Sequence, residues 1–356
     1  MKKIGGYFPY ETLLEKKNEF LEGLCPENGD LRYLMSGRCA IYYALKDYKY
    51  TDRRCVAYVP IYTCETVLAP FHKAGYTLLF YDFDENMNPV FDPAVLDQIS
   101  IISICGYYGF STYNREFVAE CSRRGICIIE DTTHSIFSSD GIDPHCDYVV
   151  GSLRKWIGVA AGGFAIKTKG KFLSDPQTPH EEHLAIRKQC LDLKNHLEDR
   201  SDEELEQIFQ KGDTLFWDAE MMLRQIFDSF GSDPESVFLI QHYPVETLKA
   251  KRRDNYQYLL DRVLPSDKFR IVFPTLPEGT VPSHFTLFAS DRDTLRATLL
   301  EHEIGSTTYW PVGPLVNLEN HPNAQYIYDH VLSIPCDQRY GEKDMQKICD
   351  TLNSLQ

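Results

Sequence analysis

A carboxylate and a lysine each follow a short apolar segment in the middle of the chain. The first segment, Ile126–Glu130, is rich in β-branched residues and leads into Asp131. The second, Tyr148–Val150, leads into Lys155. Short runs of this kind are typical of buried parallel strands. The carboxyl ends of parallel strands usually present ligand-binding groups, so we expect both side chains at strand ends.

A carboxylate and a lysine at strand ends suit pyridoxal phosphate chemistry. The lysine amine can hold the cofactor aldehyde as a Schiff base. The carboxylate keeps the pyridine nitrogen protonated, so that the ring accepts electrons from a substrate carbanion. Taken alone, Lys155 is a weak signal because most lysines are exposed, and Asp131 has the alternative role of a turn cap. The interpretation therefore depends on other motifs in the right order.

The segments around this pair alternate between predicted strands and helices. Residues 55–64 are predicted to form a strand and a turn, further predicted strands cover 78–82 and 101–107, and predicted helices cover 65–74 and 113–124. This alternation, which runs from 34 to 167, favours an α/β fold with a doubly wound, mostly parallel sheet. Residues 11–24 carry leucines at helical spacing and are predicted to form an amphipathic helix.

Three motifs carry a resemblance to a known family. Ser36-Gly37-Arg38-Cys39 opens a predicted helix, whose free N–H groups and dipole can hold a phosphate. Glu130-Asp131-Thr132-Thr133-His134 ends the first strand, and Gly162-Gly163 follow Lys155 by seven and eight residues. In these motifs the chain resembles the DegT/DnrJ/EryC1/StrS aminotransferases, which are fold-type-I pyridoxal phosphate enzymes similar to aspartate aminotransferase.

The resemblance implies a role for individual residues. Lys155 is the catalytic lysine. His134 is either a partner of the cofactor phenolic oxygen or a packed histidine, and Arg38 contacts phosphate or points to solvent. The family's ring-stacking aromatic corresponds to Cys64 here, and Tyr62 and Tyr108 are the candidates to replace it. The implied cofactor-binding residues are Gly37, Arg38, Cys39, Cys64, Tyr108, Asp131, His134 and Ser152, and the implied substrate contacts are Arg154, Tyr309 and Trp310.

Two of these assignments have alternatives. The sugar aminotransferases place their phosphate-binding serine five residues before the lysine, where this chain has Val150. Ser152 instead fits the S-x-x-K spacing of other fold-type-I aminotransferases. Arg154 has the alternative of an ordinary surface charge.

The predicted domain organisation divides the chain near residue 240. Residues 1–240 are expected to form the large cofactor-binding α/β domain, with 169–236 as a divergent helical region. Residues 241–356 are expected to form a smaller α+β domain. It begins with a helix over 246–260 and continues with strands at 270–273 and 284–289 and a helix over 291–302.

Composition excludes several classes of function. The net charge of −15 argues against binding to nucleic acid or to an anionic membrane, where cations must neutralise phosphates. No apolar stretch reaches the ~20 residues that span a bilayer, and no signal peptide is evident. The eleven cysteines are scattered, which favours reduced core residues in a cytoplasmic protein. His180 and His183 lack further ligands, so no metal is expected.

The function that the resemblance implies is transamination. An amino acid, glutamate or glutamine, would donate its amino group to a keto acceptor. A nucleotide-linked keto sugar of cell-surface polysaccharide or secondary-metabolite biosynthesis is the acceptor expected, and a homodimer is the expected assembly. Ala161 stands where the family has Glu, so the cofactor is better indicated than the substrate. The alternatives are a lyase or desulfurase type of pyridoxal phosphate reaction, or a non-catalytic binding or regulatory relative.

Overall fold

The computed structural model describes residues 3–195, 197 and 200–355. His196 and Glu198–Asp199, which belong to the expected divergent region 169–236, lie outside the described residues. The chain forms two compact units. Unit 1 contains residues 1–6, 52–147 and 246–356, and unit 2 contains residues 7–51 and 148–245. The units do not follow a division at residue 240, so that boundary remains a prediction.

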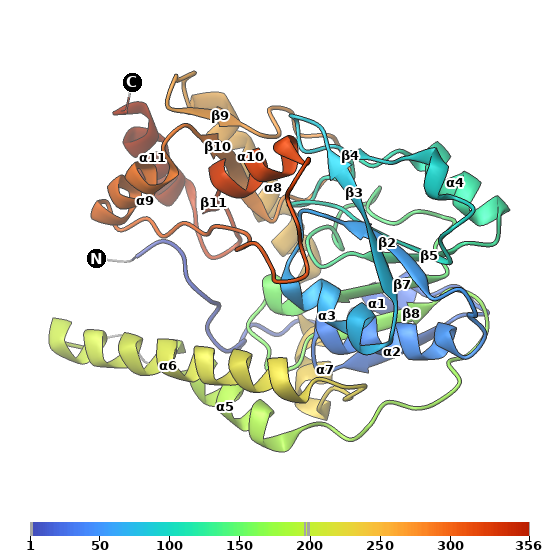
Figure 1. Ribbon diagram of the computed structural model, residues 1–356. Coiled ribbons are helices and arrows are strands. Elements are labelled where there is room, and N and C mark those ends of the chain that lie inside the picture. Colours follow the sequence, from blue (N-terminus) through green and yellow to red (C-terminus); the bar gives the residue numbers. More distant parts are fainter. Residues whose placement is uncertain (1–2, 196, 198–199, 356) are drawn as a thin grey trace. The chain divides into compact units, whose positions relative to one another are not determined.

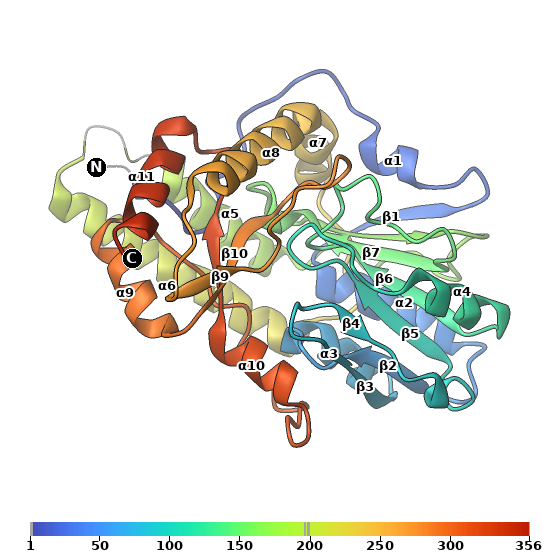
Figure 2. The same ribbon diagram turned by 90° about the horizontal axis from the view of Figure 1, so that it is seen from above.

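Unit 1 is built on a mostly parallel sheet. Its strands lie in the order β6-β5-β2-β3-β4, in which β6, β5, β2 and β3 are parallel and β4 is antiparallel at the edge (Figure 2). The sheet strands are β2 (Val56–Pro60), β3 (Thr77–Phe83), β4 (Pro89–Val90), β5 (Ile101–Cys105) and β6 (Cys127–Asp131), and the helices between them are α3 (Glu65–Lys73), η1 (Pro93–Val95) and α4 (Arg115–Arg123).

The rest of unit 1 forms a small antiparallel sheet with four helices. Its strands lie in the order β11-β10-β9, and Figure 1 shows α9 and α11 beside them. The elements are α8 (Val245–Arg262), β9 (Phe269–Ile271), β10 (His284–Ala289), α9 (Arg292–Glu301), α10 (Pro322–His330), β11 (Val331–Pro335) and α11 (Glu342–Asn353). Asp291 caps α9 by accepting a hydrogen bond from the Thr294 N–H at 3.0 Å, which confirms the predicted start of this helix.

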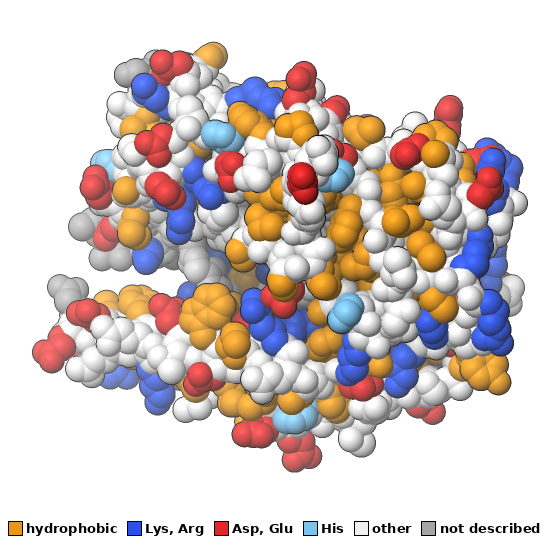
Figure 3. Space-filling model, viewed as in Figure 1, with side chains coloured by type: hydrophobic (Ala, Val, Ile, Leu, Met, Phe, Trp, Pro, Cys, Tyr) orange, Lys and Arg blue, Asp and Glu red, His pale blue; other side chains and the backbone are white. Residues whose placement is uncertain are grey.

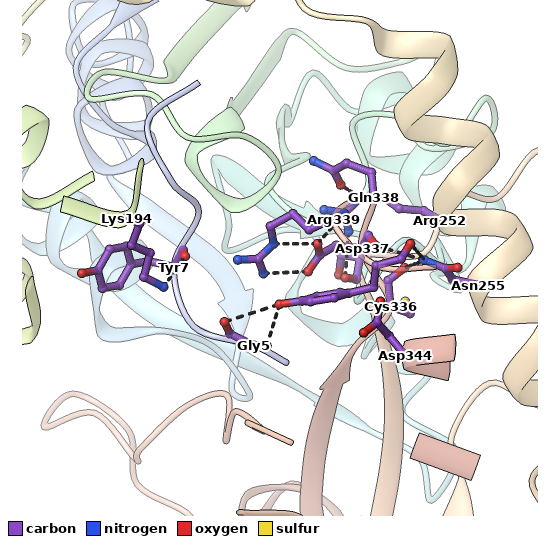
Figure 4. Close-up of polar contacts among 12 residues, drawn as sticks. Gly5, Tyr7, Lys194, Arg252, Asn255, Cys336, Asp337, Gln338, Arg339 and Asp344 are labelled. Atoms are coloured by element: carbon purple, nitrogen blue, oxygen red, sulfur yellow. Dashed lines mark hydrogen bonds and ion pairs between the residues drawn. The ribbon is translucent and has the colours of Figure 1, made fainter. Parts of the chain in front are cut away.

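Helix α8 fixes the turn that follows β11. The Asn255 side-chain amide donates hydrogen bonds to the carbonyl oxygens of Cys336, Asp337 and Tyr340, at 3.0–3.2 Å (Figure 4). The Asp337 carboxylate is buried and pairs with the Arg339 guanidinium through two N···O contacts of 2.7 and 2.8 Å. Because buried backbone acceptors must be satisfied, the Asn255 side chain stabilises the turn that connects β11 to α11.

Unit 2 combines a three-stranded antiparallel sheet with a helical hairpin. The strands lie in the order β1-β8-β7, and Figures 1 and 2 show α5 packed along α6. The elements are α1 (Phe20–Leu24), β1 (Asp30–Leu34), α2 (Gly37–Lys49), β7 (Tyr148–Ser152), η2 (Leu153–Lys155), β8 (Gly163–Lys167), α5 (Glu181–Asp192), η3 (Leu193–Asn195), α6 (Asp202–Ile226) and α7 (Pro234–His242).

The helix predicted over residues 11–24 is wrong for most of its length. Only Phe20–Leu24 is helical, while the backbone N–H groups of Glu15 and Asn18 donate to the carbonyls of His242 and Gln241. The leucines at positions 13 and 14 are exposed and do not form a buried face. Pairing of the backbone with the end of α7 therefore replaces the intrahelical bonds that the leucine spacing suggested.

Hydrophobic side chains also lie exposed along α6. They include Phe209, Trp217 and Met221, and Figure 3 shows hydrophobic atoms gathered along this helix. Among the described residues, no helix combines the length and the apolar character that crossing a bilayer requires. None of the cysteines in the described ranges forms a disulfide, and seven of the eleven are buried.

Candidate active site

Lys155 lies at the end of a short turn that is anchored on both sides. Strand β7 is buried throughout and passes into η2, where Leu153 is buried. Trp156 follows the lysine, is fully buried, and donates its backbone N–H to the Leu153 carbonyl at 2.8 Å. Lys155 itself is exposed. The two buried neighbours therefore fix the backbone on both sides of the lysine.

Ser36 caps α2 as expected. Its Oγ accepts a hydrogen bond from the Cys39 N–H at 3.2 Å, and α2 begins at Gly37. Arg38 is buried rather than directed to solvent, and its guanidinium lies 5.4 Å from the centre of the Phe227 ring. The helix start thus combines backbone N–H groups, a positive dipole end and a nearby cation, which together favour an anion.

The pair Gly162-Gly163 brings the lysine turn and the helix start together. In the sheet of unit 2, Gly163 is the register partner of both Leu34 and Ser152. A Cβ on Gly163 would lie 2.3 Å from the Ser36 carbonyl oxygen, and one on Gly162 would lie 2.9 Å from the Arg154 nitrogen. Only residues without a side chain allow this approach. Sequence spacing located the pair, and the structure supplies the steric reason for it.

Arg154 is not a surface charge. Its side chain is 11% exposed, and its Nη2 donates a hydrogen bond to Oε1 of Glu220 on α6. Ser152 is buried at the end of β7, three residues before Lys155. Unit 2 therefore brings together Ser36, Gly37, Arg38, Cys39, Ser152, Arg154 and Lys155 around one sheet end.

In unit 1, Asp131 ends β6 as expected. Its Oδ1 accepts hydrogen bonds from the Thr133 N–H at 2.9 Å and from the Thr133 hydroxyl at 2.5 Å. These bonds stabilise the ionised carboxylate and fix its orientation. Asp131 thus combines the cap of a turn with a strand-end carboxylate.

An aromatic cluster in unit 1 contains four of the expected residues. The His134 ring stacks on Trp310, with centroids 5.5 Å apart and an interplanar angle of 27°. The His134 centroid also lies 5.5 Å from Tyr108 and 5.4 Å from Tyr309. Three segments that are distant in sequence thus meet at one place: the turn after β5, the turn after β6 and the loop before α10.

Two further residues belong to this cluster: Tyr62, a sequence candidate for the ring-stacking position, and His284, which was assigned no site role from sequence alone. Tyr62 shares a hydrogen bond with the Tyr108 hydroxyl at 3.0 Å and donates another to the Tyr309 carbonyl. His284, the first residue of β10, lies with its Nε2 3.5 Å from the Tyr309 hydroxyl. Burial raises the pKa of Tyr62 well above its usual range, and the neighbouring Tyr108 adds to this, so Tyr62 remains a neutral phenol.

Cys64 is not among the ring contacts of the aromatic cluster. It stands at the N-cap of α3, where its sulfur accepts a hydrogen bond from the Thr66 hydroxyl at 3.1 Å. Tyr62 was one of the two sequence candidates for the ring-stacking position. His284 has no comparable signal, since the fold alone brings β10 to this cluster.

Sequence comparison finds no relatives, whereas structural comparison does. No protein-family model and no curated protein matches the chain. Among solved structures, PseC of Helicobacter pylori, an aminotransferase involved in the biosynthesis of pseudoaminic acid, has a TM-score of 0.66 at 13% identity and covers 99% of each chain. Spr1654 of Streptococcus pneumoniae in its PLP-form has a TM-score of 0.66 at 12% identity, covering 99% of this chain and 98% of that one.

A third structure connects the fold with the family named above. A DegT DnrJ EryC1 StrS aminotransferase from Brucella abortus has a TM-score of 0.58 at 16% identity, over 91% of this chain and 85% of that one. At such identities the likeness establishes the fold. The predicted fold class is confirmed: the chain has the fold of the fold-type-I sugar aminotransferases.

Proposed function

We propose that the protein is a pyridoxal-phosphate-dependent aminotransferase. The observation that carries this proposal is the arrangement within unit 2. An exposed lysine on a rigid turn lies beside a capped helix N-terminus, and a glycine pair brings the two together. A lysine amine and an anion-binding helix start are the two anchors that this cofactor requires. The shared fold with a protein solved in its PLP-form supports the same conclusion.

The residues present fit this cofactor chemically. Lys155 would hold the aldehyde, and the N–H groups of the α2 start, with Ser152 and Arg38, would hold the phosphate. Asp131, oriented by its two hydrogen bonds from Thr133, would keep the pyridine nitrogen protonated. When bound, the cofactor supplies an electron sink for a carbanion at the substrate carbon. The amine of Lys155 would act as general base to take a proton from that carbon, and then as general acid to deliver it to the former aldehyde carbon of the cofactor.

The proposed reaction transfers an amino group from glutamate or glutamine to a keto acceptor. A nucleotide-linked keto sugar is the proposed acceptor, because a structure of the same fold is that of an aminotransferase in pseudoaminic acid biosynthesis. A homodimer is the proposed assembly, and a cytoplasmic location agrees with the absence of disulfides among the cysteines of the described ranges.

Absorbance spectroscopy with reductive trapping tests the proposal. Purified protein incubated with pyridoxal phosphate should gain a visible absorbance band, and borohydride treatment should then add the mass of the reduced cofactor to the peptide that contains Lys155. Lys155→Ala should lose both signals. Lys169→Ala, a change at an exposed lysine just after β8, should keep both.

The response to the amino donor separates transamination from its alternatives. Glutamate should bleach the visible band, and a keto acid should restore it. A band that forms but does not respond to either compound would favour a lyase or desulfurase type of reaction. Protein that remains colourless would overturn the enzyme proposal and favour a non-catalytic relative.

A further inference from the structure

Unit 2 contains a buried group of charged side chains next to the lysine turn. It consists of Arg154 in η2, His183 and Arg187 on α5, and Glu220 on α6, and we call it the arginine cluster. Oε1 of Glu220 accepts hydrogen bonds from Nη2 of Arg154 and, at 3.3 Å, from Nη1 of Arg187. One carboxylate thus joins two guanidinium groups and ties the α5–α6 hairpin to the residue before Lys155.

The charges of the arginine cluster do not balance. Burial raises the pKa of Glu220, but Arg154 and Arg187 outweigh this effect and hold it at about 2, so the carboxylate is ionised. Burial and the two arginines lower the pKa of His183 to about 3, so that ring is neutral. Two positive charges therefore face one negative charge. An uncompensated charge away from water is unfavourable.

The cluster also contains polar atoms that lack a hydrogen-bond partner. Within the part of the chain that the structure describes, both ring nitrogens of His183 and Nε of Arg187 have none. The side chain of Arg187 is only 4% exposed, and His183 is 0% exposed. Because buried polar atoms are nearly always hydrogen-bonded, these three point to a missing partner.

Aromatic packing does not restore the balance. The Arg187 guanidinium lies 5.2 Å from the centre of the Phe216 ring, which gives a favourable cation–π contact. A ring carries no net charge, so one positive charge remains. Arg154 and Glu220 keep 11% and 22% of their side chains exposed, so the cluster borders the surface on their side.

We propose that the arginine cluster is a binding site for an oxyanion of the substrate, a carboxylate or a phosphate, held beside Lys155. Arg154 and Arg187 bind the anion, and Glu220 is a positioning residue that orients both guanidinium groups. Assigning the anion to the substrate depends on the proposed function, but the anion site itself does not. The α5–α6 hairpin, which lies in the divergent part of the sequence, thereby contributes to substrate selection.

Titration calorimetry with two probes tests this site. The protein is first saturated with pyridoxal phosphate, and glutarate or inorganic pyrophosphate is then added. Arg187→Gln should weaken binding of the preferred probe tenfold or more, because a hydrogen bond to a charged group is lost. Glu220→Gln should strengthen it by about the same factor, since the competing carboxylate is removed. Preference for glutarate would assign the site to an amino acid carboxylate, and preference for pyrophosphate to a nucleotide diphosphate.

Opposite effects of the two variants distinguish an anion site from a structural network, in which both changes would only destabilise the protein. Lys188→Gln is the matched control, because it removes a cation of α5 that pairs instead with Asp233 and Glu235, and its affinity should equal that of the wild type. If Arg187→Gln does not fold, the sign of the Glu220→Gln effect decides. Weaker binding in Glu220→Gln, or no binding by the wild type, would overturn the site.

Failure of the proposed function gives a different pattern. A protein that takes up no pyridoxal phosphate, but whose anion affinity still falls in Arg187→Gln and rises in Glu220→Gln, keeps the site and loses the proposed function. In that case the anion affinity of Ser36→Ala is measured as well, because pyrophosphate could then bind at the start of α2 instead of at the arginine cluster. If the visible band forms but neither Arg187→Gln nor Glu220→Gln changes the anion affinity, the anion site is overturned and the proposed function stands.

Discussion

Glu130 and Asp131 are neighbours in β6, yet their environments are opposite. Successive side chains of a strand point to opposite faces, so Glu130 is buried whereas Asp131 is partly exposed. The Glu130 carboxylate accepts hydrogen bonds from the Tyr113 hydroxyl at 2.8 Å and from the Asp143 N–H at 2.7 Å. Burial nevertheless raises the pKa of Glu130 to about 7, and nearby Asp143 adds to this effect.

This pKa predicts how stability depends on pH. The folded-state pKa of Glu130 lies above its unfolded value, so the folded protein holds the extra proton between about pH 4.5 and 7. The contribution of Glu130 to stability therefore falls across that window, by up to about 3 kcal/mol. Glu130→Gln cannot ionise, and its amide can still accept from the Asp143 N–H. We expect this variant to be more stable than the wild type above pH 7.

Urea denaturation at several pH values between 4 and 8 measures the effect. The difference between Glu130→Gln and wild type should grow as pH rises through the window and level off above it. Glu116→Gln, at an exposed position of α4, should follow the wild-type profile. A constant difference between Glu130→Gln and wild type at every pH would show that the carboxyl does not titrate there.

At the scale of elements, local signals predicted much of the fold. The cap of α2 at Ser36, the span of α3 and the cap of α9 at Asp291 agree with the structure because each depends on residues close in sequence. The predicted helix over 11–24 failed because its backbone pairs with a distant segment. The hydrogen bonds of Glu220 with Arg154 and Arg187 could not be predicted from the sequence either, since they depend on how α6 packs on α5 and η2.

The approach of β8 to the start of α2 gives a prediction at this scale. A Cβ at Gly163 would lie 2.3 Å from the Ser36 carbonyl oxygen and 2.4 Å from its carbonyl carbon, both backbone atoms. Backbone cannot move aside as a flexible side chain does, so we expect Gly163→Ala to lower the free energy of unfolding by about 1–3 kcal/mol. Denaturant unfolding measures this loss.

A second glycine provides the control for that variant. Gly23 lies in α1, and a Cβ there would meet no atom within 4 Å. Gly23→Ala should leave the stability unchanged or raise it by up to about 1 kcal/mol, because alanine restricts the unfolded chain. Equal effects of the two substitutions would contradict the steric role of Gly163.

For the whole molecule, the exposed face of α6 bears on the expected homodimer. Phe209, Trp217 and Met221 are 38%, 59% and 48% exposed, and their spacing of eight and four residues places them on one side of the helix. Asp213 lies between Phe209 and Trp217 on this face, so the apolar row is interrupted. Scattered exposed apolar residues are normal, but three on one helix face, one of them a tryptophan, favour an interface. We therefore expect this face of α6 to take part in the dimer.

Analytical ultracentrifugation of Trp217→Glu tests that expectation. The wild type should sediment as a dimer, and the variant should dissociate with a dimer affinity at least tenfold weaker, because a buried tryptophan at an interface contributes about 2 kcal/mol or more. Leu173→Glu is the control, since Leu173 is 60% exposed and lies outside α6. A wild-type monomer would contradict the dimer itself. A Trp217→Glu dimer of unchanged affinity would show that the subunits meet elsewhere, because a glutamate in a desolvated contact cannot be accommodated without cost.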